Sequence, residues 1–170
     1  QIYILNQRSK TIIKISTESP ADFGIKAADI IINDAKNKIK KNNKFNIGIP
    51  GGRMPISIFN SLNERYMNGE DLNWNKINFF WIDDRFVSHD HKDSNYKLFS
   101  DHFAQYAKNL NCYPIPFSNS INKCAIEYEN TILENVELNS EEIPCFDLLL
   151  IGVGDDGHIA SLFPNSEELR

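Results

Sequence analysis

The residues best suited to chemistry lie in one stretch near the end of the chain, at positions 146–164. An apolar segment runs there into a glycine-rich loop that carries Asp155, Asp156 and His158. Histidine titrates near neutral pH, so it can take up or release a proton without a large change in its pKa. A neighbouring carboxylate can fix one imidazole nitrogen and leave the other free as a base. The stretch therefore predicts general acid–base chemistry centred on His158.

Two earlier loops share the placement of this one, because each directly follows an apolar, strand-like segment. They are Gly51-Gly52-Arg53, after residues 45–50, and Asp83-Asp84-Arg85, after residues 77–82. The carboxyl ends of parallel strands meet at one edge of a sheet, so the three loops should converge on one crevice. The glycines precede a predicted helix whose N-terminus can receive an anion, and Arg53 can add a charge-assisted contact to phosphate.

Each candidate also has a plainer interpretation. The glycines can form an ordinary tight turn with a surface arginine, residues 83–85 can form a salt bridge at a strand end, and His158 can bond to backbone. His89 and His91 lie in a polar loop with Lys92, where solvated side chains are commoner than a metal site, so we expect no metal. Ser161 lacks the G-x-S-x-G surroundings of a nucleophile.

The three loops need a scaffold, and strand and helix signals alternate along the chain. Strands are predicted near 12–15, 45–50, 77–82 and 146–153. Helices are predicted from Ser19-Pro20 through Ala35, over 55–66, after a cap at Ser94, and over 125–136. This alternation predicts an α/β fold with a mainly parallel sheet. At 170 residues, the chain is expected to form a single domain over 1–170.

Composition narrows the class of partner. A net charge of −5 and a pI near 5.4 argue against binding to nucleic acid or an anionic membrane, although local cations can still hold a phosphorylated ligand. The odd cysteine count, with no CxxC pair, argues against a disulfide framework and indicates a reducing, cytoplasmic location. The chain starts at Gln1 without methionine and ends at Arg170 just after its most informative motif, so we expect a fragment of a longer protein.

Together the three motifs resemble the 6-phosphogluconolactonase family. The run from Phe146 to Pro164, with Gly154-Asp155-Asp156-Gly157-His158-Ile159-Ala160 at its centre, is similar to that family's signature. Trp81 to Val87 followed by Ser94-Asn95-Tyr96 resembles its D-E-R…S-N segment, and Gly51-Gly52 lies where its glycine loop belongs. The resemblance covers nearly the whole chain in the family's order.

The resemblance implies a three-layer, Rossmann-like α/β domain with helices on both faces, related to glucosamine-6-phosphate deaminase/isomerase. It implies hydrolysis of 6-phospho-D-glucono-1,5-lactone to 6-phosphogluconate in the oxidative pentose phosphate pathway, with no cofactor. His158 would be the general base and Asp156 its orienting partner. Gly51, Gly52, Arg53, Asp84 and Arg85 would hold the sugar phosphate. Some lineages fuse this domain to glucose-6-phosphate dehydrogenase, which would suit the missing start methionine.

The sequence departs from the family in several places. Arg53 follows the glycines where Ser or Thr is usual, Asp84 replaces a commoner Glu, and the family fold continues well beyond Arg170. Two other functions stay open. An aminosugar-6-phosphate deaminase/isomerase would prefer an Asp-Glu-Tyr motif and an Asn-Glu-Pro continuation, whereas Arg85 and Ser161-Leu162-Phe163-Pro164 favour the lactonase. A non-catalytic sugar-phosphate-binding domain could keep the fold without the chemistry.

Overall fold

A parallel sheet lies at the centre of the structure, a computed structural model that describes residues 1–6, 11–107 and 109–169. Its strands are β3 (Phe45–Ile49), β4 (Ile77–Trp81), β5 (Asn111–Tyr113) and β6 (Leu148–Leu149), in the order β5-β4-β3-β6. β3 and β4 pair along their full length, from Phe45 opposite Ile77 to Ile49 opposite Trp81. Every residue of these two strands is buried, as expected when helices cover both faces of a parallel sheet.

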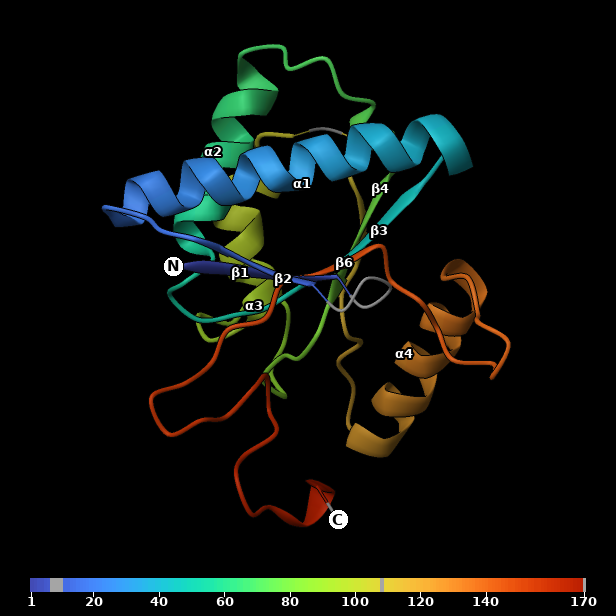
Figure 1. Cartoon of the computed structure of the whole chain (residues 1–170). Coiled ribbons are helices and arrows are strands. Elements are labelled where there is room, and N and C mark those ends of the chain that lie inside the picture. The colour runs from blue at the N-terminus through green and yellow to red at the C-terminus, as the bar shows by residue number, and fades with distance from the viewer. Residues whose placement is uncertain (7–10, 108, 170) are drawn as a thin grey trace.

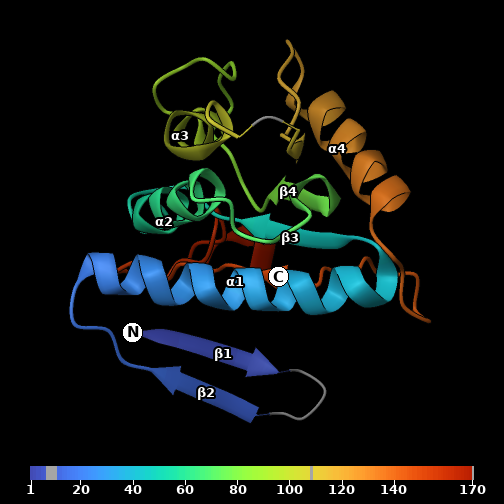
Figure 2. The ribbon, with the colours of Figure 1, turned by 90° about the horizontal axis from the view of Figure 1, so that it is seen from above.

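Helices lie on the two faces of this sheet (Figures 1 and 2). α1 (Pro20–Asn42), α2 (Ile56–Met67) and α3 (Asn95–Phe99), which continues as the π-helix η2 (Ser100–Ala104), cover one face. α4 (Ile121–Asn135) covers the other. Side chains alternate along β4, so that Phe79 packs against Phe99 of α3 on one face while Phe80 stacks on Tyr113 of β5 on the other. The expected three-layer α/β architecture is therefore confirmed.

The core under α1 and α2 is rich in aromatic rings. Phe59 of α2 meets Phe99 edge to face at 5.0 Å, and Phe103 lies 5.5 Å from Phe99. α1 and α2 approach closely at Gly24, where an added Cβ would lie 2.3 Å from the carbonyl oxygen of Ser57. These contacts bury the face of the sheet on which α1 and α2 lie, next to the loops that leave β3 and β4.

The predicted helix starts agree with the structure. Ser19 caps α1 by accepting a hydrogen bond from the backbone N–H of Asp22, and Pro20 occupies the first turn. Ser94 caps α3 in the same way through Lys97. An antiparallel hairpin that the sequence did not predict in full, β1 (Ile2–Asn6) and β2 (Thr11–Ile15), lies alongside α1 (Figure 2). Short 3₁₀ turns, η1 (Trp74–Lys76) and η3 (Glu167–Leu169), complete the elements.

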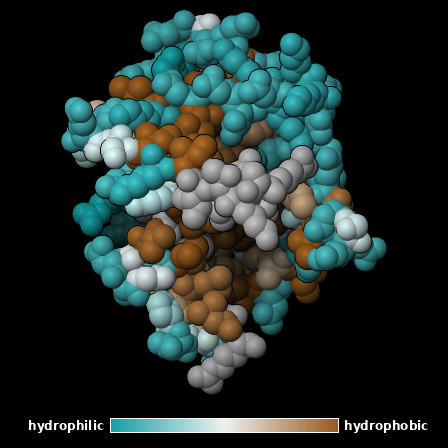
Figure 3. Space-filling view, viewed as in Figure 1, coloured by the Kyte–Doolittle hydropathy of each residue, from teal (hydrophilic) through white to brown (hydrophobic). Residues whose placement is uncertain are grey.

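The predicted strand 146–153 was wrong in its extent, and β5 was not predicted. Only Leu148–Leu149 forms a ladder with β3, opposite Ile47 and Gly48, and the last hydrogen bond runs from the N–H of Leu150 to the carbonyl of Gly48, which leaves the residues after Leu150 outside the ladder. Ile151 and Val153 are consequently 51% and 70% exposed. Apolar side chains gather below the sheet in the view of Figure 3, in the region where Figure 1 draws the segment after β6. Within the described residues, no helix combines the length and apolar character that crossing a membrane requires.

Candidate active site

The three loops predicted to converge do come together. At the end of β3, a Cβ on Gly51 would fall inside the carboxamide of Asn95, the residue that opens α3. The side chain of Met54 reaches Gly152 after β6, where an added Cβ would lie 3.4 Å from the methionine methyl carbon. Ser161 Oγ, in the loop beyond β6, donates a hydrogen bond of 2.8 Å to Asp83 Oδ2 after β4. The segments that follow the three strands are therefore joined through Asn95, Met54 and Ser161, which lie next to the predicted loops in the sequence or in space.

His158 and Asp156 form a close pair within the last loop. His158 Nδ1 lies 2.5 Å from Asp156 Oδ1, and the backbone N–H of His158 donates to the same oxygen at 3.2 Å. These hydrogen bonds, that from the imidazole first, lower the pKa of Asp156 and keep it ionised. Because an ionised carboxylate only accepts, it selects the tautomer with a proton on Nδ1 and leaves Nε2 free to act as a base.

Glycines shape this loop around the imidazole. A Cβ on Gly154 would lie 2.2 Å from His158 Cε1, so position 154 must lack a side chain. Gly157 has a φ of +86°, a conformation that favours glycine. The N–H of Gly154 donates to the carbonyl of His158 at 2.9 Å, and the ring of Phe163 lies 4.9 Å from the imidazole. The spacing of glycines and histidine in the sequence is thus explained by one compact turn.

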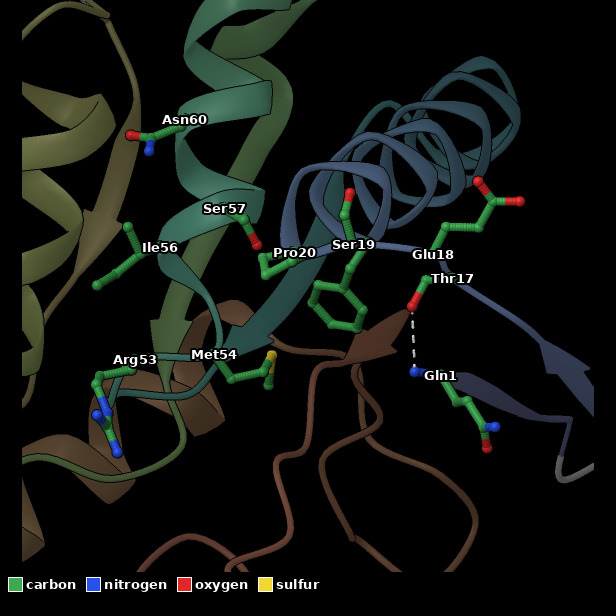
Figure 4. A pocket seen from close by; sticks show the side chains of 11 residues that line it. Gln1, Thr17, Glu18, Ser19, Pro20, Arg53, Met54, Ile56, Ser57 and Asn60 are labelled. Atoms are coloured by element: carbon green, nitrogen blue, oxygen red, sulfur yellow. Dashed lines mark hydrogen bonds between the residues drawn. The ribbon is translucent and has the colours of Figure 1, made fainter.

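Gly51, Gly52 and Arg53 occupy the turn between β3 and α2, as expected. Gly52 has a φ of +79° and open space where a Cβ would stand, so its backbone is accessible to a ligand. Arg53 and Met54 line one side of an open cleft of about 640 Å³, and Thr17, Glu18 and Ser19 line another (Figure 4). Arg53 thus supplies an exposed cation beside the glycine turn, on the path from β3 to the N-terminus of α2.

Asp84 was predicted to contact the substrate, but its carboxylate already accepts hydrogen bonds from four groups of the protein. Its two carboxylate oxygens accept hydrogen bonds from Ser94 Oγ and from three backbone N–H groups, those of Arg85, Asn95 and Tyr96. This arrangement compensates the positive end of α3. Since these donors already surround the carboxylate and a phosphate would repel it, Asp84 is better placed to position the loop than to hold substrate. Arg85 is exposed, with Nη1 3.4 Å from the carbonyl oxygen of Asp93.

Three residues of the crevice were absent from the predicted set of site residues: Asp83, Asn95 and Ser161. Asp83 Oδ1 receives Asn95 Nδ2 at 3.4 Å while its Oδ2 receives Ser161, so its carboxylate lies between two loops. A signal existed for Asp83, which precedes Asp84 in the same strand-end motif, and for Asn95, which follows the helix cap Ser94. Nothing in the local sequence pairs Ser161 with a residue 78 positions earlier.

The other candidate ligands lie apart from a common centre. His89 Nε2 is 2.8 Å from the carbonyl oxygen of Ile115, and His91 Nδ1 accepts from the backbone of Asp93. In the part of the chain that the structure describes, no three His, Cys, Asp or Glu side chains are grouped so that they could hold a metal ion. Cys112, Cys124 and Cys145 are free thiols.

Comparison with known proteins gives independent evidence of the family to which this chain is similar. The family model described as glucosamine-6-phosphate isomerases/6-phosphogluconolactonase matches residues 18–170. The 6-phosphogluconolactonase of Nostoc sp. is 32% identical over 149 residues, covering 85% of this chain and 60% of that protein. Probable 6-phosphogluconolactonase 1 of Arabidopsis thaliana is 34% identical over 164 residues, covering 90% of this chain and 59% of that protein.

Solved structures that are similar to this chain come from the same family as these relatives. The crystal structure of 6-phosphogluconolactonase from Thermotoga maritima superposes with a TM-score of 0.73 at 26% identity, covering 91% of this chain and 66% of that one. The 6-phosphogluconolactonase from Plasmodium vivax gives 0.68 at 29% identity, covering 88% of this chain and 50% of that one. The chain spans about 60% of the length of the curated relatives it matches.

Proposed function

The chain belongs to the glucosamine-6-phosphate isomerase/6-phosphogluconolactonase family, and we propose that its protein hydrolyses 6-phospho-D-glucono-1,5-lactone to 6-phosphogluconate in the pentose phosphate pathway. The observation that carries the proposal is the His158–Asp156 pair, 2.5 Å apart, in a loop joined to the two other strand-end loops. Relatives named as 6-phosphogluconolactonases support the choice of substrate.

The chemistry follows from the state of the imidazole. With Nδ1 held by Asp156, Nε2 takes a proton from water as the oxygen attacks the lactone carbonyl carbon. The tetrahedral intermediate then collapses with cleavage of the ring ester bond, and the proton passes to the departing ring oxygen. The products are a hydroxyl group and a carboxylic acid, which releases its remaining proton to solvent, and the water attacks directly, so no covalent enzyme intermediate is needed.

Phosphate recognition is assigned to the turn after β3. The backbone at Gly52 is open to solvent, and Arg53 supplies an exposed guanidinium beside it. Arg85 adds a second exposed cation from the loop after β4. In this proposal Asp84 acts indirectly, by fixing the N-terminus of α3 and with it the loop that carries Arg85.

The test is His158→Ala in the complete natural protein. We expect lactone hydrolysis to fall by about 10²–10⁴-fold, the usual contribution of a positioned base, with the affinity for 6-phosphogluconate nearly unchanged. His102→Ala is the matched control, since His102 Nδ1 pairs with Asn60 on α2, outside the three loops. Turnover by His158→Ala at the wild-type rate would remove the base from this mechanism.

The same preparation separates the rival functions. Ammonia release from glucosamine 6-phosphate without lactone hydrolysis would identify an aminosugar-6-phosphate deaminase/isomerase. Binding of 6-phosphogluconate without either reaction would identify a non-catalytic binding domain. Arg85 and Ser161 are two of the residues that favour the lactonase over the deaminase/isomerase in the sequence. In the structure the hydroxyl of Ser161 donates a hydrogen bond to Asp83.

Location and partners complete the proposal. We assign the protein to the cytoplasm, with three free thiols as support. None of the relatives described above is named as a fusion, so the link to glucose-6-phosphate dehydrogenase stays a prediction.

A further inference from the structure

We propose that Asn95 is a positioning residue that sets the glycine turn after β3 and the His158 loop at the distance catalysis requires. The proposal rests on the function proposed above and adds a residue to it. Asn95 opens α3, and among the described residues its hydrogen bonds go to Asp83 and Asp84 rather than to Gly52 or the imidazole. Its effect must therefore pass through its neighbours.

Asn95 is held rigidly. The residue is only 4% exposed. Its backbone N–H donates to Asp84 Oδ1 at 2.7 Å, and its Nδ2 donates to the carbonyl oxygen of Asp83 at 3.0 Å and to Asp83 Oδ1 at 3.4 Å. Because Asn95 is buried and bonded at both its backbone and its side chain, a displacement of this residue should reach Asp83 and Asp84 through these hydrogen bonds.

Gly51 fits against this carboxamide. A Cβ at position 51 would lie 1.8 Å from Asn95 Oδ1 and 2.0 Å from its Cγ, which no side chain can occupy. Gly52 next to it differs, because its Cβ would meet nothing within 4 Å and only its φ of +79° favours glycine. The first glycine therefore serves contact with Asn95, and the second serves the turn itself.

The other end of the chain of contacts reaches the catalytic loop. Asp83 Oδ2 accepts from Ser161 Oγ at 2.8 Å, three residues after His158. The path from Gly51 through Asn95 and Asp83 to Ser161 thus joins the segments that follow the three strands. A shift of about 1 Å between a phosphate site and a base can cost about 10²-fold in rate.

The experiment is a double-mutant cycle in the complete natural protein. Asn95→Ala and Gly51→Ala should each lower kcat/KM by about 10–100-fold. The double variant should be no worse than Asn95→Ala alone, because the carboxamide that a methyl group at position 51 would strike is gone. Gly52→Ala is the matched control, and its effect should multiply with that of Asn95→Ala. Multiplicative effects for Gly51→Ala as well would overturn the proposal.

A second measurement does not depend on turnover. The NMR resonance of the His158 ring should move in Asn95→Ala and in Ser161→Ala, since each cuts the path to its loop. An unmoved resonance in both would overturn the proposal. Should Asn95→Ala fail to fold, the cycle of Gly51→Ala with Ser161→Ala, whose hydroxyl is exposed, replaces it. Movement of the His158 resonance in both variants without lactone hydrolysis would reject the proposed reaction and keep the positioning role.

Discussion

Replacing Tyr128 with phenylalanine should destabilise the protein by about 2–3 kcal/mol. The Tyr128 hydroxyl, on α4, accepts from the backbone N–H of Trp81 at 2.8 Å and donates to the carbonyl oxygen of Trp81 at 2.7 Å. β5 reaches only the position opposite Phe80, so one hydroxyl completes the edge of β4 at its last residue. Trp81 is 2% exposed, and each buried polar group left without a partner costs about 1–3 kcal/mol. Two such groups, the N–H and the carbonyl of Trp81, would together cost about 2–6 kcal/mol. Water that enters to bond with them should reduce this cost to about 2–3 kcal/mol.

Urea denaturation of Tyr128→Phe is the assay, with Tyr106→Phe as control because Tyr106 is 51% exposed. The midpoint should fall by about 1 M or more for a slope near 2 kcal/mol/M, with the slope unchanged. Burial raises the pKa of Tyr128, so the folded state keeps the hydroxyl neutral while the unfolded chain ionises above about pH 10. The stability that depends on the neutral Tyr128 hydroxyl is therefore fully present below about pH 10 and is lost as the pH rises further. Tyr128→Phe should lack this pH dependence, because phenylalanine has no hydroxyl to ionise. A loss below about 0.5 kcal/mol would refute the reasoning.

Two further outcomes follow from packing and burial. Gly24→Ala should cost about 1–3 kcal/mol in the same denaturation assay, because its Cβ would lie 2.3 Å from the carbonyl of Ser57; the gain of about 1 kcal/mol that helix propensity alone predicts would contradict close α1–α2 packing. Iodoacetamide at about pH 8 should label the exposed Cys145 well before Cys112, whose pKa burial raises to about 12. Equal labelling rates of the two cysteines in mass spectrometry would contradict the burial of Cys112. The stability that depends on the neutral Cys112 thiol should be fully present below about pH 9 and decline as the pH rises toward about 12.

Much of the architecture could be predicted because its signals are local. Ser19, Pro20 and Ser94 mark helix starts through hydrogen bonds within one turn. The apolar runs at 45–50 and 77–82 predict buried strands because both of their faces need cover. The convergence of three loops also followed, since parallel strands deliver their ends to one edge.

Strand ends were predicted less well because they depend on a neighbour. Leu148 to Ile151 form one apolar run, yet only Leu148 and Leu149 pair with β3, and the hydrogen bonding to β3 ends with the N–H of Leu150. β5 is short and its residues carry no alternating pattern, so only its pairing with β4 reveals it.

Within the site, the sequence predicted a carboxylate partner for His158, and the resemblance to the family chose Asp156, which the structure places 2.5 Å from the imidazole. It also predicted that Gly51 and Gly52 form the turn after a strand, though not that they serve different purposes. Only the tertiary structure decided that Asp84 accepts hydrogen bonds from the first N–H groups of α3, that Asn95 fills the space beside Gly51, and that Ser161 reaches Asp83. These contacts join residues as many as 78 positions apart, and such distances are set by the packing of β3, β4 and α3, which no local pattern encodes.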